Sequence, residues 1–387
     1  MIRRRECLSN ALGLLGYSLW TNADRGSAHA EGQVPERDRT ADEALREAPA
    51  VTLRCGALGA RVLIPDGRRG FYRGTRFDWS GMISSLTLGE QQFYGAWFET
   101  IARTVRDFQY GSNNVIVAGP NSAAVGPAEE FDWRDPPGFA QAQAGDLFLK
   151  IGVGGLIKPD GEPYSNARDF RIAEPGRRDV DCTRSSATFR HSVGDIGGYA
   201  YEYQKRVLLS STGPALHIVH TLCNTGSRSI TTQVYNHNFL TFGATGLSRG
   251  ASITFPFPIA VTPPLLGPAV PMKGNQIVLF PALEKKDNVA ALINGFDGRR
   301  QHHRFVVEDL RSSASAEIIG DQPLTRLGLW SIRSVLAVEP FVQLTVRPGE
   351  SVRWTQTTKF FAAGRDSKVG DVRLSGSRYR DVSEHQG

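Results

Sequence analysis

From Val51 onward, apolar and polar residues alternate in short runs. This is the pattern of half-buried strands, because successive side chains of a strand point to opposite faces of a sheet. Residues 199–209 place three tyrosines on one face, and residues 215–223 and 230–240 repeat the alternation after short turns. Three successive strands joined by short turns predict an antiparallel meander.

The C-terminal part shows the same pattern. Residues 335–346 and 352–361 predict two strands joined by an Arg-Pro-Gly-Glu turn at 347–350. The chain has 41 glycines and 21 prolines, which favours many turns over long helices. We therefore predict an all-β fold in which residues 51–363 form one large antiparallel multi-sheet sandwich.

The two ends of the chain have a different character. Three arginines at 3–5 precede a mildly apolar stretch at 11–20, and Ala28-His29-Ala30 fits a signal-peptidase site. Residues 4–9 also resemble a twin-arginine export motif. We expect an export signal at 1–30, a polar linker at 31–50 and a loose polar tail at 364–387. An exported, periplasmic protein is the favoured interpretation, and an uncleaved extension on a cytoplasmic protein is the alternative.

Composition and missing motifs exclude several classes of function. The 45 basic and 39 acidic residues give a net charge of +6 that is not gathered in blocks, so nucleic acid is not an expected partner. Beyond residue 30, no run of 18 apolar residues predicts a membrane span. The Gly-Val-Gly-Gly run at 152–155 is followed by Ile157 where a dinucleotide loop needs glycine. No Gly-x-Ser-x-Gly or His-Glu-x-x-His motif is present. We expect no cofactor and no metal, a solvated loop at His302-His303, and at most one disulfide in the mature chain.

Two titratable residues interrupt strands that are otherwise apolar or neutral. His237 shares a face with Tyr235 and Phe239, where its environment could tune a pKa near neutrality. The alternative is a hydrogen-bonded core histidine. Glu339 precedes Pro340, which indicates an edge or a bulge. A buried glutamate needs a partner, so it has either a salt bridge with an arginine or a functional role.

These residues lie in segments that resemble a known family. The run Tyr-Asn-His-Asn-Phe at 235–239, preceded by Cys-Asn-Thr-Gly at 223–226, resembles the segment of aldose 1-epimerases (galactose mutarotases) where a strand ends in Asn-His and an aromatic residue. Val-Glu-Pro at 338–340 and the turn at 347–350 look like that family's C-terminal glutamate strand. Residues 126–131 and 150–154 resemble bacterial mutarotase-like proteins outside the best-studied branch. The resemblance covers roughly residues 51–363.

The resemblance implies a galactose mutarotase-like supersandwich whose concave face binds a monosaccharide or a sugar-containing small molecule. It also implies an isomerase that interconverts sugar anomers, with His237 as general acid and Glu339 as general base. The residue types suit this chemistry, since opening a cyclic hemiacetal removes a proton from the anomeric hydroxyl and adds one to the ring oxygen.

The sequence also departs from the family. No histidine occurs between His29 and His191, so the family's early histidine is missing, and its aspartate has no clear counterpart. The residues that we assign to substrate binding are Arg76, Asp78, Glu129, Glu130, Asn236 and Trp330. Five of them have a plainer explanation: a structural salt bridge for Arg76 and Asp78, a solvated charge for each glutamate, and packing under the sandwich for Trp330.

Two other classes of function remain open. A non-catalytic carbohydrate-binding protein would keep the groove without turnover, and the missing early histidine favours it. A polysaccharide lyase or hydrolase on a related scaffold is the other alternative. A lyase could use Tyr235 with His237, whereas a glycosidase needs two carboxylates and only Glu339 has a strong case. The epimerase hypothesis is preferred because it uses both His237 and Glu339.

Overall fold

The computed structural model describes residues 38–243, 250–266, 272–279 and 288–362, and the fold is all-β. Its largest sheet has ten strands, in the order β13 (Arg177–Cys182), β14 (Ser186–Ile196), β15 (Tyr199–Leu209), β16 (Ala215–Asn224), β27 (Ser351–Phe361), β24 (Ser315–Gly320), β23 (Arg304–Asp309), β18 (Ala251–Thr254), β21 (Gln276–Leu279) and β20 (Met272–Lys273). A six-stranded sheet has the order β19 (Ala260–Leu266), β22 (Val289–Asn294), β25 (Arg326–Ile332), β26 (Val335–Val346), β17 (Ile230–His237) and β9 (Ala128–Phe131).

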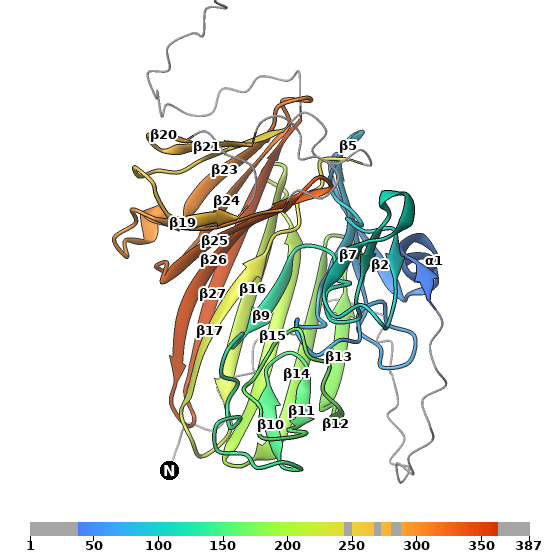
Figure 1. Ribbon diagram of the computed structural model, residues 1–387, viewed down its shortest axis with the longest axis vertical. Helices are drawn as coiled ribbons and strands as arrows, with labels where there is room; N and C mark the ends of the chain where they lie inside the picture. The colour runs from blue at the N-terminus through green and yellow to red at the C-terminus, as the bar shows by residue number, and fades with distance from the viewer. Residues whose placement is uncertain (1–37, 244–249, 267–271, 280–287, 363–387) are drawn as a thin grey trace, which may run out of the picture.

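Smaller sheets complete the molecule (Figure 1). Four strands at the start of the described chain form a meander: β2 (Ala50–Cys55), β3 (Leu58–Leu63), β4 (Ile83–Leu88) and β5 (Gln91–Tyr94). Two further sheets contain β1 (Arg39–Thr40), β6 (Thr100–Ile101), β8 (Ile116–Ala118) and β7 (Phe108–Tyr110), and β10 (Leu147–Lys150), β11 (Gly154–Ile157) and β12 (Ile172–Glu174). The helical segments are α1 (Ala41–Glu47) and two 3₁₀ turns, Ser112–Asn114 and Arg300–His302.

The two largest sheets pack face to face and enclose the core. Leu216 and Phe360 of the ten-stranded sheet belong to the same buried cluster as Leu329 and Val338 of the six-stranded sheet. A second cluster joins Tyr203 to Val342 and their neighbours in the same way. The predicted multi-sheet sandwich is confirmed.

The predicted pairing of strands is wrong in two places. β15 and β16 pair as expected, but β17 leaves that sheet and pairs with β26 and β9. The expected hairpin of β26 and β27 also divides between the two sheets, because β27 pairs with β16 and β24. The chain thus crosses between the two sheets from β16 to β17 and again from β26 to β27. Both crossings lie at one end of the sandwich, where the Asn224 side chain donates to the Arg228 and Val346 carbonyls at 2.7 and 2.8 Å.

The packed unit begins before residue 51. The Thr40 hydroxyl caps α1 by accepting a hydrogen bond from the Glu43 amide at 3.1 Å. Ala41, Ala44 and Ala48 are buried against an aromatic cluster of the core. The second half of the expected linker is therefore part of the domain, whereas the expected leader at 1–30 and the tail at 364–387 lie outside the described residues.

No disulfide joins Cys55, Cys182 and Cys223, the cysteines of the described residues. None of the helices in the described ranges is long and apolar enough to span a membrane.

Candidate functional site

The candidate site lies on one face of the six-stranded sheet, where β9, β17 and β26 are adjacent. Tyr235 of β17 is opposite Phe341 on one side and Glu130 on the other. His237 is opposite Ala128 of β9. Residues two apart in a strand share a face. Antiparallel pairing thus brings the two predicted catalytic residues, about a hundred positions apart in the chain, to neighbouring strands.

The His237 and Glu339 side chains are in direct contact. His237 Nε2 lies 3.1 Å from Glu339 Oε1, and the two side chains are 6% and 18% exposed. The imidazole stacks on Phe239 with a centroid distance of 3.7 Å. A Cβ added to Gly328, which is opposite Glu339 on β25, would lie 2.6 Å from Glu339 Oε2, so this glycine makes room for the carboxylate.

One alternative in each of the two expectations about Glu339, the sheet edge and the salt bridge with an arginine, is wrong. Its strand is not at an edge, because β26 lies between β25 and β17. Pro340 has no amide hydrogen to donate to a neighbouring strand. It is tolerated because the pairing of β26 with β17 stops at Phe341. The partner of Glu339 is a histidine and not an arginine.

Burial shifts the pKa values of the pair in opposite directions. It lowers the pKa of His237 well below its usual value, and the positive charge of Arg76 acts in the same direction. Burial raises the pKa of Glu339 to about 7, an effect that Arg76 and Arg326 oppose and Glu130 reinforces. Near neutral pH the carboxyl is therefore close to half-ionised, which suits a group that exchanges protons.

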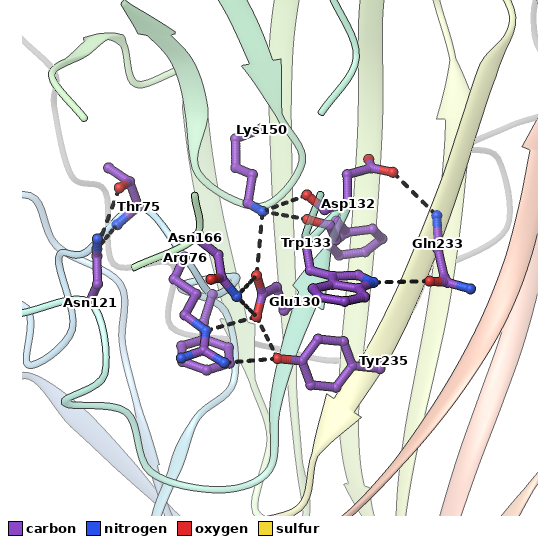
Figure 2. A network of polar contacts seen from close by, with 12 residues as sticks. Thr75, Arg76, Asn121, Glu130, Asp132, Trp133, Lys150, Asn166, Gln233 and Tyr235 are labelled. Atoms are coloured by element: carbon purple, nitrogen blue, oxygen red, sulfur yellow. Dashed lines mark hydrogen bonds and ion pairs between the residues drawn. The ribbon is translucent and has the colours of Figure 1, made fainter. Parts of the chain in front are cut away.

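Arg76 is held beside this pair by a buried polar network (Figure 2). Its Nε donates to Glu130 Oε2 at 2.8 Å and its Nη2 to the Tyr235 hydroxyl at 3.1 Å. Glu130 also accepts from the Tyr235 hydroxyl at 2.5 Å and from Asn166 at 2.9 Å, with Lys150 Nζ at 3.9 Å. Arg76 and Lys150 outweigh burial, so the pKa of Glu130 is lowered. Protein donors engage both Glu130 oxygens, which favours positioning of Arg76 over direct sugar contact.

Three predicted binding residues lie on the opposite face of the sheet. Glu129 pairs with Lys205 and accepts from Asn236 Nδ2 at 2.9 Å. Asp78 lies 3.6 Å from Lys205 Nζ and accepts from the Tyr203 hydroxyl at 3.2 Å. All of these groups are buried between the two sheets. Glu129 and Asn236 face away from the His237 pair because each adjoins a residue that faces toward it. A structural role is favoured for these three residues. The solvated charge given as the alternative for each glutamate is wrong, because Glu129 and Glu130 are both buried.

Aromatic residues flank the pair on both sides. Trp330 meets the His237 ring edge-on at 5.4 Å and is half-buried against Trp97 and Phe108. On the other side, Phe341 stacks on Tyr235 at 4.3 Å. Arg76, Glu130 and Trp330 thus lie around the His237–Glu339 pair.

Sequence reasoning missed Trp133. Its ring lies 6.1 Å from Phe341, and its Nε1 donates to Gln233 at 3.1 Å (Figure 2). Asp132, directly before it, has a φ of 46°, so the chain leaves regular strand geometry there. Simple alternation along β9 therefore cannot place Trp133, and no signal in the sequence marks it as a site residue.

Two cavities in the described part of the chain are not lined by His237 or Glu339. A small interior cavity between the sheets contains Glu129 and His303 in its lining. His303 is buried and its Nδ1 lies 2.8 Å from the Gln322 carbonyl oxygen, so the expected solvated loop is wrong at this residue. A larger hollow of about 310 Å³ adjoins the loop at residues 103–106. Over the described ranges, no group of three or more His, Cys, Asp or Glu side chains could hold a metal ion.

Comparison with known proteins gives structural likeness only. No family model matches the chain, and no curated protein matches it. Similar solved structures include the Slr1438 protein of Synechocystis sp. PCC 6803, with 12% identity, TM-score 0.48 and coverage of 81% of this chain and 96% of that one. A galactose mutarotase-like protein of Lactobacillus casei has 12% identity, TM-score 0.45 and coverage of 81% and 100%. The GalM/aldose epimerase homologue of C. elegans has 10% identity, TM-score 0.44 and coverage of 82% and 100%.

The structural neighbours are galactose mutarotase-like proteins. A shared architecture does not fix chemistry, so the case for an activity depends on the side chains of the site.

Proposed function

We propose that this protein is an aldose 1-epimerase-like isomerase that interconverts the anomers of a sugar. The observation that carries the proposal is the contact of His237 Nε2 with Glu339 Oε1 at 3.1 Å, beside the polar head of Arg76. Anomer exchange needs one group that accepts a proton and one that donates a proton, within reach of the same hemiacetal. A carboxylate and an imidazole in contact meet that need.

In the proposed mechanism, Glu339 accepts the proton of the anomeric hydroxyl as the C1–O1 double bond forms. The C1–O5 bond breaks, and its electron pair takes a proton from His237. After rotation about the C1–C2 bond, closure on the other face of the carbonyl reverses both transfers. The raised pKa makes Glu339 a stronger base, and the lowered pKa makes protonated His237 a stronger acid. Because Glu339 and His237 are in contact, a proton can pass from one to the other and return both groups to their starting protonation states.

Arg76 supplies the hydrogen-bond donors that this site offers in place of the missing early histidine. Its guanidinium is 16% exposed and held by Glu130 and Tyr235, so it is positioned before a sugar arrives. Trp330 offers an apolar wall to the ring. The ligand is a monosaccharide or a sugar-containing small molecule.

Polarimetry or NMR of freshly dissolved α-glucose and α-galactose tests the proposal. We expect His237→Asn and Glu339→Gln each to slow anomer exchange by about 100-fold or more, the lower range of general acid–base contributions. His302→Asn and Glu350→Gln are matched controls at residues outside the site. Wild-type rates in either site variant would remove that residue from the mechanism.

A non-catalytic carbohydrate-binding protein is the second candidate. The small exposure of the His237 side chain favours it, because a proton donor must reach the sugar. Sugar binding by the wild-type protein without any acceleration of anomer exchange would select this candidate. A glycosidase is disfavoured because protein donors already engage Glu130, the second carboxylate on this face.

We also propose that the protein is exported to the periplasm with removal of residues 1–30. The basic residues, apolar stretch and Ala-His-Ala site at the N-terminus support this proposal. Sequencing of the N-terminus of the protein recovered from a bacterial periplasm tests it, and recovery of the intact chain from the cytoplasm would contradict it.

A further inference from the structure

Two arginines meet on Trp133 at the edge of the candidate site. The Arg134 guanidinium lies 4.0 Å from the Trp133 ring centre, and that of Arg326 lies 4.9 Å from it. Arg326 also lies 5.5 Å from the Phe341 ring. Within the described ranges, neither arginine forms an ion pair with a carboxylate. Aromatic faces therefore contact both guanidinium groups, and the negative charge of Glu339 also acts on Arg326.

The environment of Arg326 is unfavourable without a further partner. Burial and the positive charge of Arg134 lower its pKa, and Glu339 and Tyr235 oppose this shift without cancelling it. Its Nε is buried and has no hydrogen-bond acceptor among the described residues. Buried donors without an acceptor are rare in folded proteins. An anionic ligand would balance the two like charges and offer an acceptor to the unsatisfied donor.

The position of Arg326 relates it to the catalytic pair. Arg326 is opposite Phe341, and Gly328 is opposite Glu339 on the same two strands. Residues two apart in a strand are about 6–7 Å apart and share a face. The Arg326 backbone is thus about one sugar ring away from that of Gly328, and Trp133 lies under its guanidinium.

Another cluster of arginines is a weaker candidate. Arg103, Arg106 and Arg168 line the hollow beside the loop at 103–106, together with Asp169. Arg168 is already paired with Asp160, with Nη1 at 2.9 Å from Oδ1. Its charge is balanced, and the hollow does not include His237 or Glu339.

We propose that Arg326 and Arg134 bind the carboxylate of an acidic sugar, such as a hexuronic acid, whose anomeric carbon faces His237 and Glu339. This inference rests on the proposed function and names its substrate class. A guanidinium lying against aromatic rings presents its N–H groups in its own plane, which matches the planar, bidentate geometry of a carboxylate.

Calorimetric titration of the full chain with methyl glucuronide and methyl glucoside tests the subsite without catalysis, because neither ligand has a free anomeric hydroxyl. We expect the glucuronide to bind at least about 10-fold more tightly, the size of a charge-assisted pair. Arg326→Gln should abolish this preference and leave glucoside affinity unchanged. Arg326→Lys should retain part of it, because it keeps the charge and loses the planar fork. Arg353→Gln, at an exposed position of β27, is the matched control for the change in charge.

Equal affinity for the two methyl glycosides would overturn the inference. So would an Arg326→Gln variant, folded by circular dichroism, that weakens both ligands equally. A preference for glucose 6-phosphate over glucuronate would show that the subsite does not select a carboxylate, and would also overturn it. Selective glucuronide binding without any anomer exchange of free glucuronate would support the subsite and contradict the proposed isomerase.

Discussion

The proposed chemistry depends on the position of one carboxylate, that of Glu339. Glu339 reaches His237 because Gly328, on the neighbouring strand, has no side chain. An added Cβ would lie 2.6 Å from Glu339 Oε2 and 3.3 Å from its Cβ, so the carboxylate would have to move. The contact of Glu339 with His237 therefore depends on open space at Gly328 as well as on polar groups.

We therefore expect Gly328→Ala to slow anomer exchange by about 100-fold, the cost of moving a catalytic group by roughly 1 Å. The stability change should be small, because the displaced atoms are at the end of a flexible side chain. Gly59→Ala in β3 is the matched control, since the nearest atom to its Cβ would be Thr87 Oγ1 at 3.7 Å. Rates measured by polarimetry that are equal for the two variants would show that the position of Glu339 does not limit the reaction.

The pH dependence of the reaction should report the charges around Glu339. The pair works when it shares one proton, so the rate should fall as pH rises through the Glu339 pKa of about 7. The negative charge of Glu130 raises this pKa. Glu130→Gln removes that charge, and the alkaline fall should move to lower pH. A profile of kcat/KM between about pH 5 and pH 9 measures the shift. An alkaline fall at the same or a higher pH in Glu130→Gln would contradict this prediction. As the control, Glu350→Gln should leave the pH profile unchanged.

Single residues show how far the sequence could define the site. His237 and Glu339 were recognisable because they are titratable groups in strands without other charges. The choice between Glu129 and Glu130 could not be made, because adjacent residues face opposite ways and nothing in the sequence fixes which one faces the site. Trp133 was beyond reach since the positive φ at Asp132 breaks the alternation.

At the scale of elements, β9 connects the site to the interior. It presents Glu130 to Arg76 on one face and Glu129 to Lys205 of β15 on the other. Lys205 also lies 3.6 Å from Asp78, so one buried cation serves two buried carboxylates between the sheets. The pKa of Glu129 is raised to about 7 by burial, which Lys205 opposes and Asp78 reinforces. This cluster fixes the position of β9 over β15.

Lys205→Met should destabilise the protein by about 3–5 kcal/mol, because it leaves buried charge without a partner. The loss should be larger at about pH 8 than at about pH 5. Without Lys205, the pKa of Glu129 in the folded state rises further above its value in the unfolded chain. The free energy of unfolding of the variant therefore decreases as the pH rises toward this folded-state pKa. Urea unfolding at both pH values measures the effect. Arg206→Met, at the next and exposed position of β15, is the control, and an equal loss in both variants would contradict the role of the cluster.

The strands themselves were predictable, but their partners were not. Alternation and turn residues gave the positions of β15, β16, β26 and β27, because these signals are local. Whether a turn returns to the same sheet or crosses to the other is decided by contacts distant in sequence. The Asn224 side chain, which donates to carbonyls at 228 and 346, ties both crossings together, and no local pattern reveals this.

At the scale of the whole molecule, the sandwich followed from the sequence, but its N-terminal limit did not. The segment 38–50 is rich in charges, and its buried positions are small alanines with weak hydrophobic contrast. Its packing could not be predicted from the segment alone, because β1 pairs with Thr100 and Ile101 of β6, which are distant in the sequence. Short apolar side chains at helical spacing can therefore hide a packed element in a segment that otherwise predicts a linker.

Two truncated chains isolate the contribution of this segment. A chain that begins at residue 50 lacks β1 and α1, whereas a chain that begins at residue 38 retains them. Loss of Ala41, Ala44 and Ala48 and exposure of the aromatic cluster beneath them should cost about 2–4 kcal/mol by buried apolar area. The free energy of unfolding in urea, compared between the two chains, gives this cost. Because the cluster that α1 covers includes Trp97 and Phe239, which contact Trp330 and His237, the shorter chain should also lose anomer exchange. Equal stability of the two chains would mean that the domain begins at β2.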